Sequence, residues 1–265
     1  MKKIILFLAL TISFVVQSQN FHDTQGKLEI SGSGQATFTL PVAMPPSLQN
    51  VGPVINLSYS SGQMHGIAGQ GWSINSVSVI SRCATRLDID GFIDGVDFDD
   101  NDKLALDGQR LLLKSGNYWE DGSTYETEVQ SNSKIELKGV GNSIYFIVTS
   151  PDGSVSTYGQ QNGGISTDVN AYYITKFVDA NKNYINYNYF KPFGKSICIK
   201  EIYFSGNELN SNTSLLNKIV FNYDQAERVE SAFIKGINIE KESILKNIEV
   251  FTNSLLFIVP PLTER

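Results

Sequence analysis

The residues that could do chemistry in this sequence are mostly aspartates, concentrated in one stretch. Eight aspartates lie between positions 88 and 107, in the segment DIDGFIDGVDFDDNDKLALDGQRLLL. Calcium takes several oxygen ligands from loop carboxylates and carbonyls, so this segment is a candidate metal site. The candidate ligands are Asp88, Asp90, Asp97, Asp99 and Asp102.

The spacing of these aspartates departs from the EF-hand pattern. In a loop starting at Asp97, the position that requires glycine holds Asp102, and the closing glutamate position holds Gly108. Segment 88–91 also lacks a third carboxylate at the spacing that the EF-hand pattern requires. The alternative is a pair of Asp-Gly turns between short strands, with carboxylates accepting hydrogen bonds from backbone amides. We favour the turns, and we expect no metal and no cofactor.

Other catalytic patterns are missing from the sequence. There is no G-x-S-x-G segment, and His65 is the one plausible base for a Ser-His-Asp site. Gly66, Gly69 and Gly71 follow a predicted strand, but another strand-like run comes after them. They therefore lack the helix N-terminus that would bind a phosphate group.

Composition indicates a globular all-β protein. The chain has 265 residues and a formal net charge of −6, which argues against a nucleic-acid partner because the sequence has no basic stripe that would bind phosphate. Its 22 glycines, 12 tyrosines and 15 phenylalanines favour strands joined by tight turns. We expect many short antiparallel strands in a sandwich or curved sheet, with little helix.

The N-terminus has the features of an export signal. Lys2 and Lys3 precede an apolar run over 4–16, which suits a signal-peptide core and is too short to span a bilayer. We predict a signal peptide over 1–18, cleavage after Ser18, and a secreted protein without stable membrane insertion. An exported chain could oxidise Cys83 and Cys198 to one disulfide, but we favour two buried thiols.

Alternation and turn residues place the predicted strands. After a flexible lead-in over 19–34, residues 35–40 alternate apolar and polar side chains. Ile55, Leu57 and Tyr59 alternate with polar residues in the same way. A β meander is predicted over 118–158, a polar glycine loop over 160–168 and a hairpin over 173–189, followed by further strands to 251.

One stretch resembles a known family. Residues 40–74, LPVAMPPSLQNVGPVINLSYSSGQMHGIAGQGWSI, and the Ile80-Ser81-Arg82 exit are similar to the N-terminal domain of Salmonella virulence plasmid B-type proteins. That domain also opens the B components of insecticidal Tc toxins and many Rhs/YD-repeat proteins. The residues that match the family motif are Pro53, Leu57, Tyr59, Gly62, Gly66, Gly69, Gly71, Trp72 and Arg82.

The resemblance covers a domain over 35–257 and implies a secreted, non-catalytic structural module. Its relatives build a β shell that carries a toxic C-terminal part, so the implied partners are proteins: C-terminal Rhs or toxin parts, or other toxin subunits. The tail over 258–265 departs from the family and suggests a truncation.

Two other functions stay open. The first is a secreted β-sandwich adhesin or carbohydrate-binding module that uses Trp72, Trp119 and the tyrosines as stacking surfaces. The second is an ADP-ribosyltransferase or hydrolase, because some relatives carry an ADP-ribosyltransferase with a Glu-x-Glu pair, as in Glu126-Thr-Glu128. In those relatives the enzyme is a separate C-terminal domain, so we expect this pair to lie on a solvated strand edge.

Overall fold

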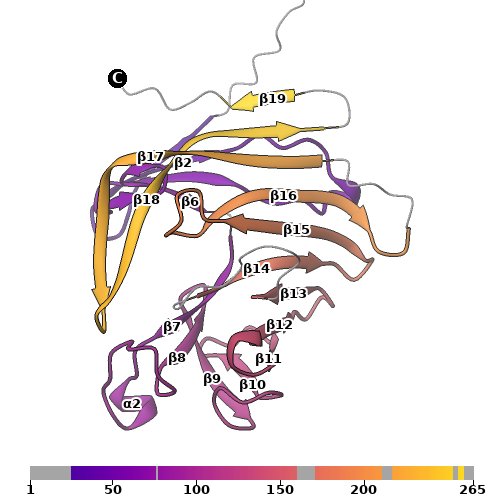
Figure 1. The fold of residues 1–265 in the computed structure, drawn as a ribbon. Coiled ribbons are helices and arrows are strands. Elements are labelled where there is room, and N and C mark those ends of the chain that lie inside the picture. The colour runs from indigo at the N-terminus through magenta and orange to yellow at the C-terminus, as the bar shows by residue number, and fades with distance from the viewer. Residues whose placement is uncertain (1–24, 76, 160–170, 211–216, 253–255, 260–265) are drawn as a thin grey trace, which may run out of the picture.

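The computed structural model describes residues 25–75, 77–159, 171–210, 217–252 and 256–259 (Figure 1). The predicted signal peptide, the first part of the lead-in, the loop at 160–168 and residues 260–265 lie outside the described residues. Within them, no helix has the length and apolar character needed to cross a membrane. The helices are short: η1 (Leu48–Asn50), α2 (Leu87–Asp90) and η2 (Gly141–Ser143).

Eight antiparallel strands close into a barrel, drawn from purple (β7) to salmon (β14) in the middle and lower part of Figure 1. The ring closes because β14 pairs with both β13 and β7. Alternate side chains of its strands, such as Ile80, Leu111 and Phe146, are almost fully buried, as the two-residue period of a strand requires. The barrel strands are β7 (Val79–Cys83), β8 (Lys103–Leu106), β9 (Gln109–Ser115), β10 (Thr124–Thr127), β11 (Lys134–Lys138), β12 (Tyr145–Thr149), β13 (Val155–Tyr158) and β14 (Ala171–Val178).

Strand β14 joins the barrel to an open curved sheet. Its first residues, 171–173, pair with β7, whereas residues 176–178 pair with β15. The chain then adds strands in order along the sheet, shown in orange and yellow in Figure 1. These strands are β15 (Asn183–Phe190), β16 (Cys198–Asn207), β17 (Asn217–Ile234), β18 (Ile237–Phe251) and β19 (Leu256–Val259).

A four-stranded sheet packs against the open sheet. It consists of β1 (Lys27–Ile30), β2 (Ala36–Pro41), β3 (Asn56–Ser60) and β6 (Trp72–Asn75). Buried Leu57 of this sheet belongs to the same apolar core as Phe204 and Phe221 of the open sheet. Two hydrogen bonds also join the layers, from Asn217 Nδ2 to the Pro46 carbonyl (3.1 Å) and from the Leu245 amide to the Ile67 carbonyl (2.7 Å).

The predicted all-β class is confirmed. Ile55 and Leu57 are buried as their alternation predicts, and the hairpin predicted over 173–189 forms from β14 and β15. One element differs from the sequence prediction, because β1 lies inside the segment expected to be a flexible lead-in. All four residues of β1 are exposed, so burial leaves no periodic signal there, and the strand is held by its pairing with β2.

A long arm leaves the open sheet. Strands β17 and β18 continue beyond their neighbours as a two-stranded hairpin, bend, and run down the left of Figure 1 towards α2. The bend coincides with a bulge, where the pairing shifts from Gln225–Ser243 to Glu230–Lys241. The extra residues on β17 bend the ribbon, as bulges do. We call residues 226–242 the arm.

Candidate functional site

The aspartate-rich segment between β7 and β8 is a structured loop, residues 84–102, which we call the acidic loop. It begins with α2, a single helical turn that ends at Gly91, whose φ of 80° suits glycine. The Asp90 carboxylate accepts the Arg86 amide (2.7 Å) and pairs with the guanidinium of Arg110. Both side chains of this ion pair are buried, and Arg110 also donates to the Ala84 carbonyl (2.8 Å). A barrel strand therefore fixes the start of the loop.

A second buried ion pair fixes the end of the acidic loop. Arg82, the last residue of the family motif, donates to the Asp102 carboxylate (2.9 Å), which is almost fully buried. That carboxylate also accepts the backbone amides of Asp97 (3.0 Å) and Phe98 (2.8 Å). The Arg82 guanidinium lies 4.4 Å from the ring centre of Trp119, whose indole N–H donates to the Asp102 carbonyl (2.9 Å). The motif arginine thus organises the acidic loop.

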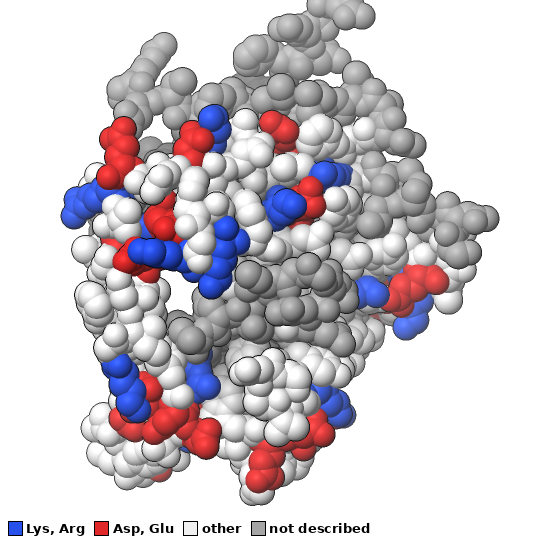
Figure 2. Space-filling view, viewed as in Figure 1, with Lys and Arg blue, Asp and Glu red and all other residues white. Residues whose placement is uncertain are grey.

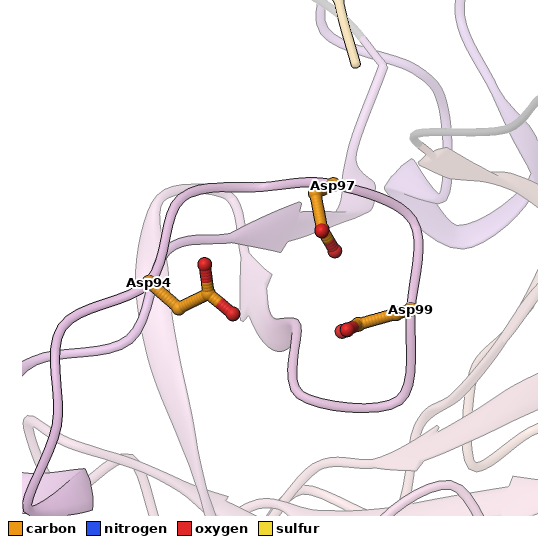
Figure 3. Close-up of side chains that lie close together, drawn as sticks. All are labelled: Asp94, Asp97 and Asp99. Carbon is orange, nitrogen blue, oxygen red and sulfur yellow. The ribbon is translucent and has the colours of Figure 1, made fainter.

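Three aspartate side chains approach one another within the loop. One carboxylate oxygen from each of Asp94, Asp97 and Asp99 lies within 4.8 Å of the others, and Figure 3 shows the three around the loop interior. We call these residues the three-aspartate cluster. Of the five predicted calcium ligands, only Asp97 and Asp99 belong to it.

The other three predicted ligands are engaged elsewhere. Asp90 and Asp102 form the two buried ion pairs described above, and Asp88 pairs with exposed Arg86 (2.6 Å). The hydrogen bond from Arg86 lowers the pKa of Asp88. Backbone amides bonded to Asp90 and Asp102 are the capping that the sequence predicts. At Asp90-Gly91, however, the predicted turn between strands is the end of a helix.

The tip of the arm contacts the three-aspartate cluster. Lys235, in the turn between β17 and β18, donates to Asp97 Oδ2 at 2.7 Å, across 138 residues of sequence. This hydrogen bond lowers the pKa of Asp97 and raises the pKa of Lys235. An ammonium group therefore already lies against the cluster.

The glycine-punctuated turn of the family motif is closely packed. β4 (His65–Gly66) and β5 (Gly69–Gln70) form a small ribbon. A Cβ atom on Gly66 would lie 1.9 Å from the Trp72 carbonyl oxygen, so no side chain fits at this glycine. The Trp72 ring packs against Tyr59 (5.4 Å between centroids) and Phe38 (6.2 Å).

The remaining motif residues support the same packing. Pro53 and Leu57 are buried, Gly62 is exposed, and Gly69 and Gly71 have positive φ. Among the described residues, no hydrogen bond joins the imidazole of His65 to a carboxylate. Both tryptophans are partly buried and pack against the core.

Glu126 and Glu128 line an open hollow of about 1030 Å³ on the outer side of β9 and β10. Each carboxylate has a cationic partner: Lys114 for Glu126 (3.1 Å) and Arg86 for Glu128 (2.7 Å). The side chains of both glutamates are partly exposed. The pair thus lies on the strand surface, within surface ion pairs.

The two thiols are both free and shielded from solvent. Cys198 is buried and Cys83 is half-buried, and both are free in the structure. Burial is the main cause that raises the pKa of each thiol. Raised values keep thiols protonated near neutral pH and unreactive.

The sequence did not reveal which cationic side chains form ion pairs with the aspartates of the acidic loop. Arg86, Arg110 and Lys235 lie 2, 20 and 138 positions from the carboxylates they contact. Only the first pair is local enough for its spacing to suggest it. The other two depend on the pairing of β9 with β8 and on the bend of the arm.

Comparisons with known proteins identify a matching family and solved structures of similar fold. The family model described as "Salmonella virulence plasmid 65kDa B protein" matches residues 30–214. A search of curated proteins gives no match. The solved N-terminal domain of the effector protein SpvB from Salmonella typhimurium strain LT2 is similar, with a TM-score of 0.60 and 16% identity over 82% of this chain and 91% of that one.

Larger toxin structures contain the same fold. The crystal structure of TcdB2-TccC3 matches with a TM-score of 0.66 and 16% identity, over 86% of this chain and 14% of that chain. A Photorhabdus luminescens Tc holotoxin pore matches with the same TM-score and identity, over 89% of this chain and 14% of that one. The chain thus spans about one seventh of these toxin chains. Because the family model covers more than half of its length, the protein belongs to the Salmonella virulence plasmid 65kDa B protein family.

Proposed function

We propose that this protein is an exported, non-catalytic structural module that contributes to the β shell of a Tc-toxin B-like or Rhs-like toxin protein. The observation that carries the proposal is the fold shared with TcdB2-TccC3, where the matching region makes up 14% of a much longer chain. A domain that forms part of a larger β assembly acts by packing and by contacts with proteins.

The placement of the acidic residues supports a structural role. The Glu126 and Glu128 carboxylates are bonded to cations, and Asp90 and Asp102 hold the acidic loop in place. Catalytic carboxylates are usually tuned by burial or by a second carboxylate. The two glutamates here are partly exposed and paired, as in surface ion pairs.

Co-expression tests the structural role. The chain is produced together with the Rhs/YD-repeat or Tc-type C proteins encoded in the same genome, and the complexes are measured by size-exclusion chromatography with light scattering. We expect a stable complex with at least one of them. A chain that stays separate from every such protein would refute the role in a shell.

A direct assay tests the absence of catalysis. The protein is incubated with labelled NAD and with a mixture of eukaryotic cell proteins, and label transfer is measured for the wild type and for Glu126→Gln/Glu128→Gln. We expect no transfer from either. Transfer by the wild type that the double variant lacks would instead establish an ADP-ribosyltransferase.

Export is tested separately. The protein is recovered from the culture medium and the cell surface of the source organism, and its N-terminus is determined by mass spectrometry. Cleavage after Ser18 predicts a mature chain that begins at Gln19. Full-length protein confined to the cytoplasm would contradict the predicted export.

A further inference from the structure

The acidic loop exposes a group of large apolar side chains. Leu87 is 62% exposed, Ile89 39%, Phe92 40% and Ile93 78%. We call these four residues the apolar knob. Single exposed apolar residues are common on protein surfaces, but four within seven positions form a concentrated patch, which is the usual mark of an interaction site.

The backbone beneath the apolar knob is held by contacts at both of its ends. The buried Asp90–Arg110 ion pair holds α2 against the barrel. On the other side, buried Thr85 and partly buried Asp94 exchange hydrogen bonds, from the Thr85 amide to the Asp94 carbonyl (3.1 Å) and from the Asp94 amide to Thr85 Oγ1 (2.5 Å). Both ends of segment 85–94 are therefore fixed before any partner binds. A preorganised loop loses little conformational entropy on binding.

Acidic side chains accompany the apolar knob on the same loop. Asp94, Asp99 and Asp100 form no ion pair with any residue that the structure describes, and Asp88 is exposed beside Leu87. Figure 2 shows carboxylates next to uncharged surface at the lower left, around α2 and the arm tip, together with lysine or arginine side chains that pair with some of them. The surface thus combines apolar contact area with negative charge.

From these features we infer that the apolar knob inserts into an apolar pocket of another protein whose rim carries lysine and arginine. The inference rests on the proposed function, since a shell module needs protein partners. Charge complementarity selects this occupant. Anionic lipid headgroups would be repelled by the carboxylates. A second copy is disfavoured because the chain itself is acidic, with a net charge of −6.

Peptide display tests the inference with a defined probe. A library of random 12-residue peptides on phage is panned on the wild-type protein, with counter-selection on Leu87→Ser/Ile93→Ser, and selected peptides are synthesised for titration calorimetry. We expect enrichment of large apolar residues together with lysine or arginine. Ile93→Ser should weaken binding by about tenfold or more, since a buried isoleucine contributes at least that much.

Two further variants separate apolar from charge effects. Asp100→Asn should weaken the selected peptides severalfold at low salt and reduce the salt dependence of binding, because it removes one exposed charge. Val140→Ser is the matched control: Val140 is 74% exposed and precedes η2, outside the acidic loop. It should leave binding unchanged.

Several results would overturn the inference. These are a selection that enriches no peptide, peptides without basic residues, or binding that the double variant retains. Sedimentation with phosphatidylglycerol vesicles, or a concentration-dependent dimer, would also overturn it if either were abolished by Leu87→Ser/Ile93→Ser. Failure of co-expression alone would remove the role in a shell while leaving peptide binding measurable, so the two failures are distinguishable.

Discussion

Replacing Arg82 should destabilise the protein strongly, because its loss leaves a buried charge without its cation. The Asp102 side chain is 1% exposed, and Arg82 is the only described cation that forms an ion pair with it. Removing one partner of a buried ion pair costs about 3–5 kcal/mol. In Arg82→Ala the Asp102 carboxylate keeps two backbone amide donors, so we take the lower end of this range, about 3 kcal/mol, for the loss of the ion pair.

The stacking of Arg82 on Trp119 adds to this estimate. A partly desolvated cation–π contact contributes about 1 kcal/mol, which brings the expected loss for Arg82→Ala to about 4 kcal/mol. In a protein of this size, each kcal/mol corresponds to about 2–4 °C in Tm, so the midpoint should fall by about 8–16 °C. Arg82→Lys keeps the charge but loses the planar stacking geometry, and it should cost about half as much.

The assay is urea unfolding followed by tryptophan fluorescence, with a thermal scan as a second measurement. Lys134→Ala is the control, since exposed Lys134 forms a surface pair with partly exposed Glu136, which also pairs with Lys138, and its loss should cost less than about 0.5 kcal/mol. If Arg82→Ala lost less than about 1 kcal/mol, the view that the motif arginine organises the acidic loop would be wrong.

Four further outcomes are expected. Gly71→Ala should lower the free energy of unfolding in urea by about 2–4 kcal/mol, since φ at Gly71 is +76° and a Cβ atom would lie 2.6 Å from the Tyr59 ring. Gly95→Ala is the control: Gly95 has open space around it, and the change should lower the free energy of unfolding by less than about 1 kcal/mol. Burial raises the pKa of Tyr158 to about 12, so the neutral phenol stabilises the folded state by about 3 kcal/mol below pH 10. This stabilisation should be lost as pH rises from 10 towards 12, and absorbance at 295 nm should show tyrosine ionisation coinciding with unfolding. Lys235→Gln should lower the hydrogen-exchange protection factors of arm amides at pH 7, because it removes the ion pair with Asp97. In the wild type, protection should fall in 1 M salt, which screens this pair. It should also fall as acid titrates Asp97 through its lowered pKa, because the ion pair exists only above that pKa. Millimolar calcium should leave the Tm unchanged within about 1 °C, and a clear rise would establish the three-aspartate cluster as a metal site.

The features predicted from sequence were those that short-range patterns encode. Alternation placed Leu57 in the core, and the Asp107-Gly108 pair forms the tight turn between β8 and β9, with both residues at positive φ. The hairpin of β14 and β15 was identified for the same reason. Each of these depends on residues within a few positions of one another.

The closure of the barrel was not predicted, because it depends on pairing between distant strands. β7 and β14 are about 90 residues apart, and nothing in their side-chain pattern specifies that the first half of β14 pairs with β7 and the second half with β15. Register is fixed by burial of one face, which is a property of the assembled sheet. The predicted sandwich or curved sheet therefore describes the upper part of the molecule but omits the barrel.

The acidic loop shows how the same aspartates support two different interpretations. Counted along the sequence, they suggest a metal-binding loop, because each carboxylate is a potential oxygen ligand. In the folded chain, Asp90 and Asp102 are bonded to arginines from barrel strands, and Asp97 contacts Lys235 of the arm. Side-chain cations thus neutralise three carboxylates and brace the loop, a role that a bound ion has in many calcium loops. The bracing keeps segment 85–94 in place while its apolar side chains face solvent, so the charge pattern and the exposed knob have a single physical explanation.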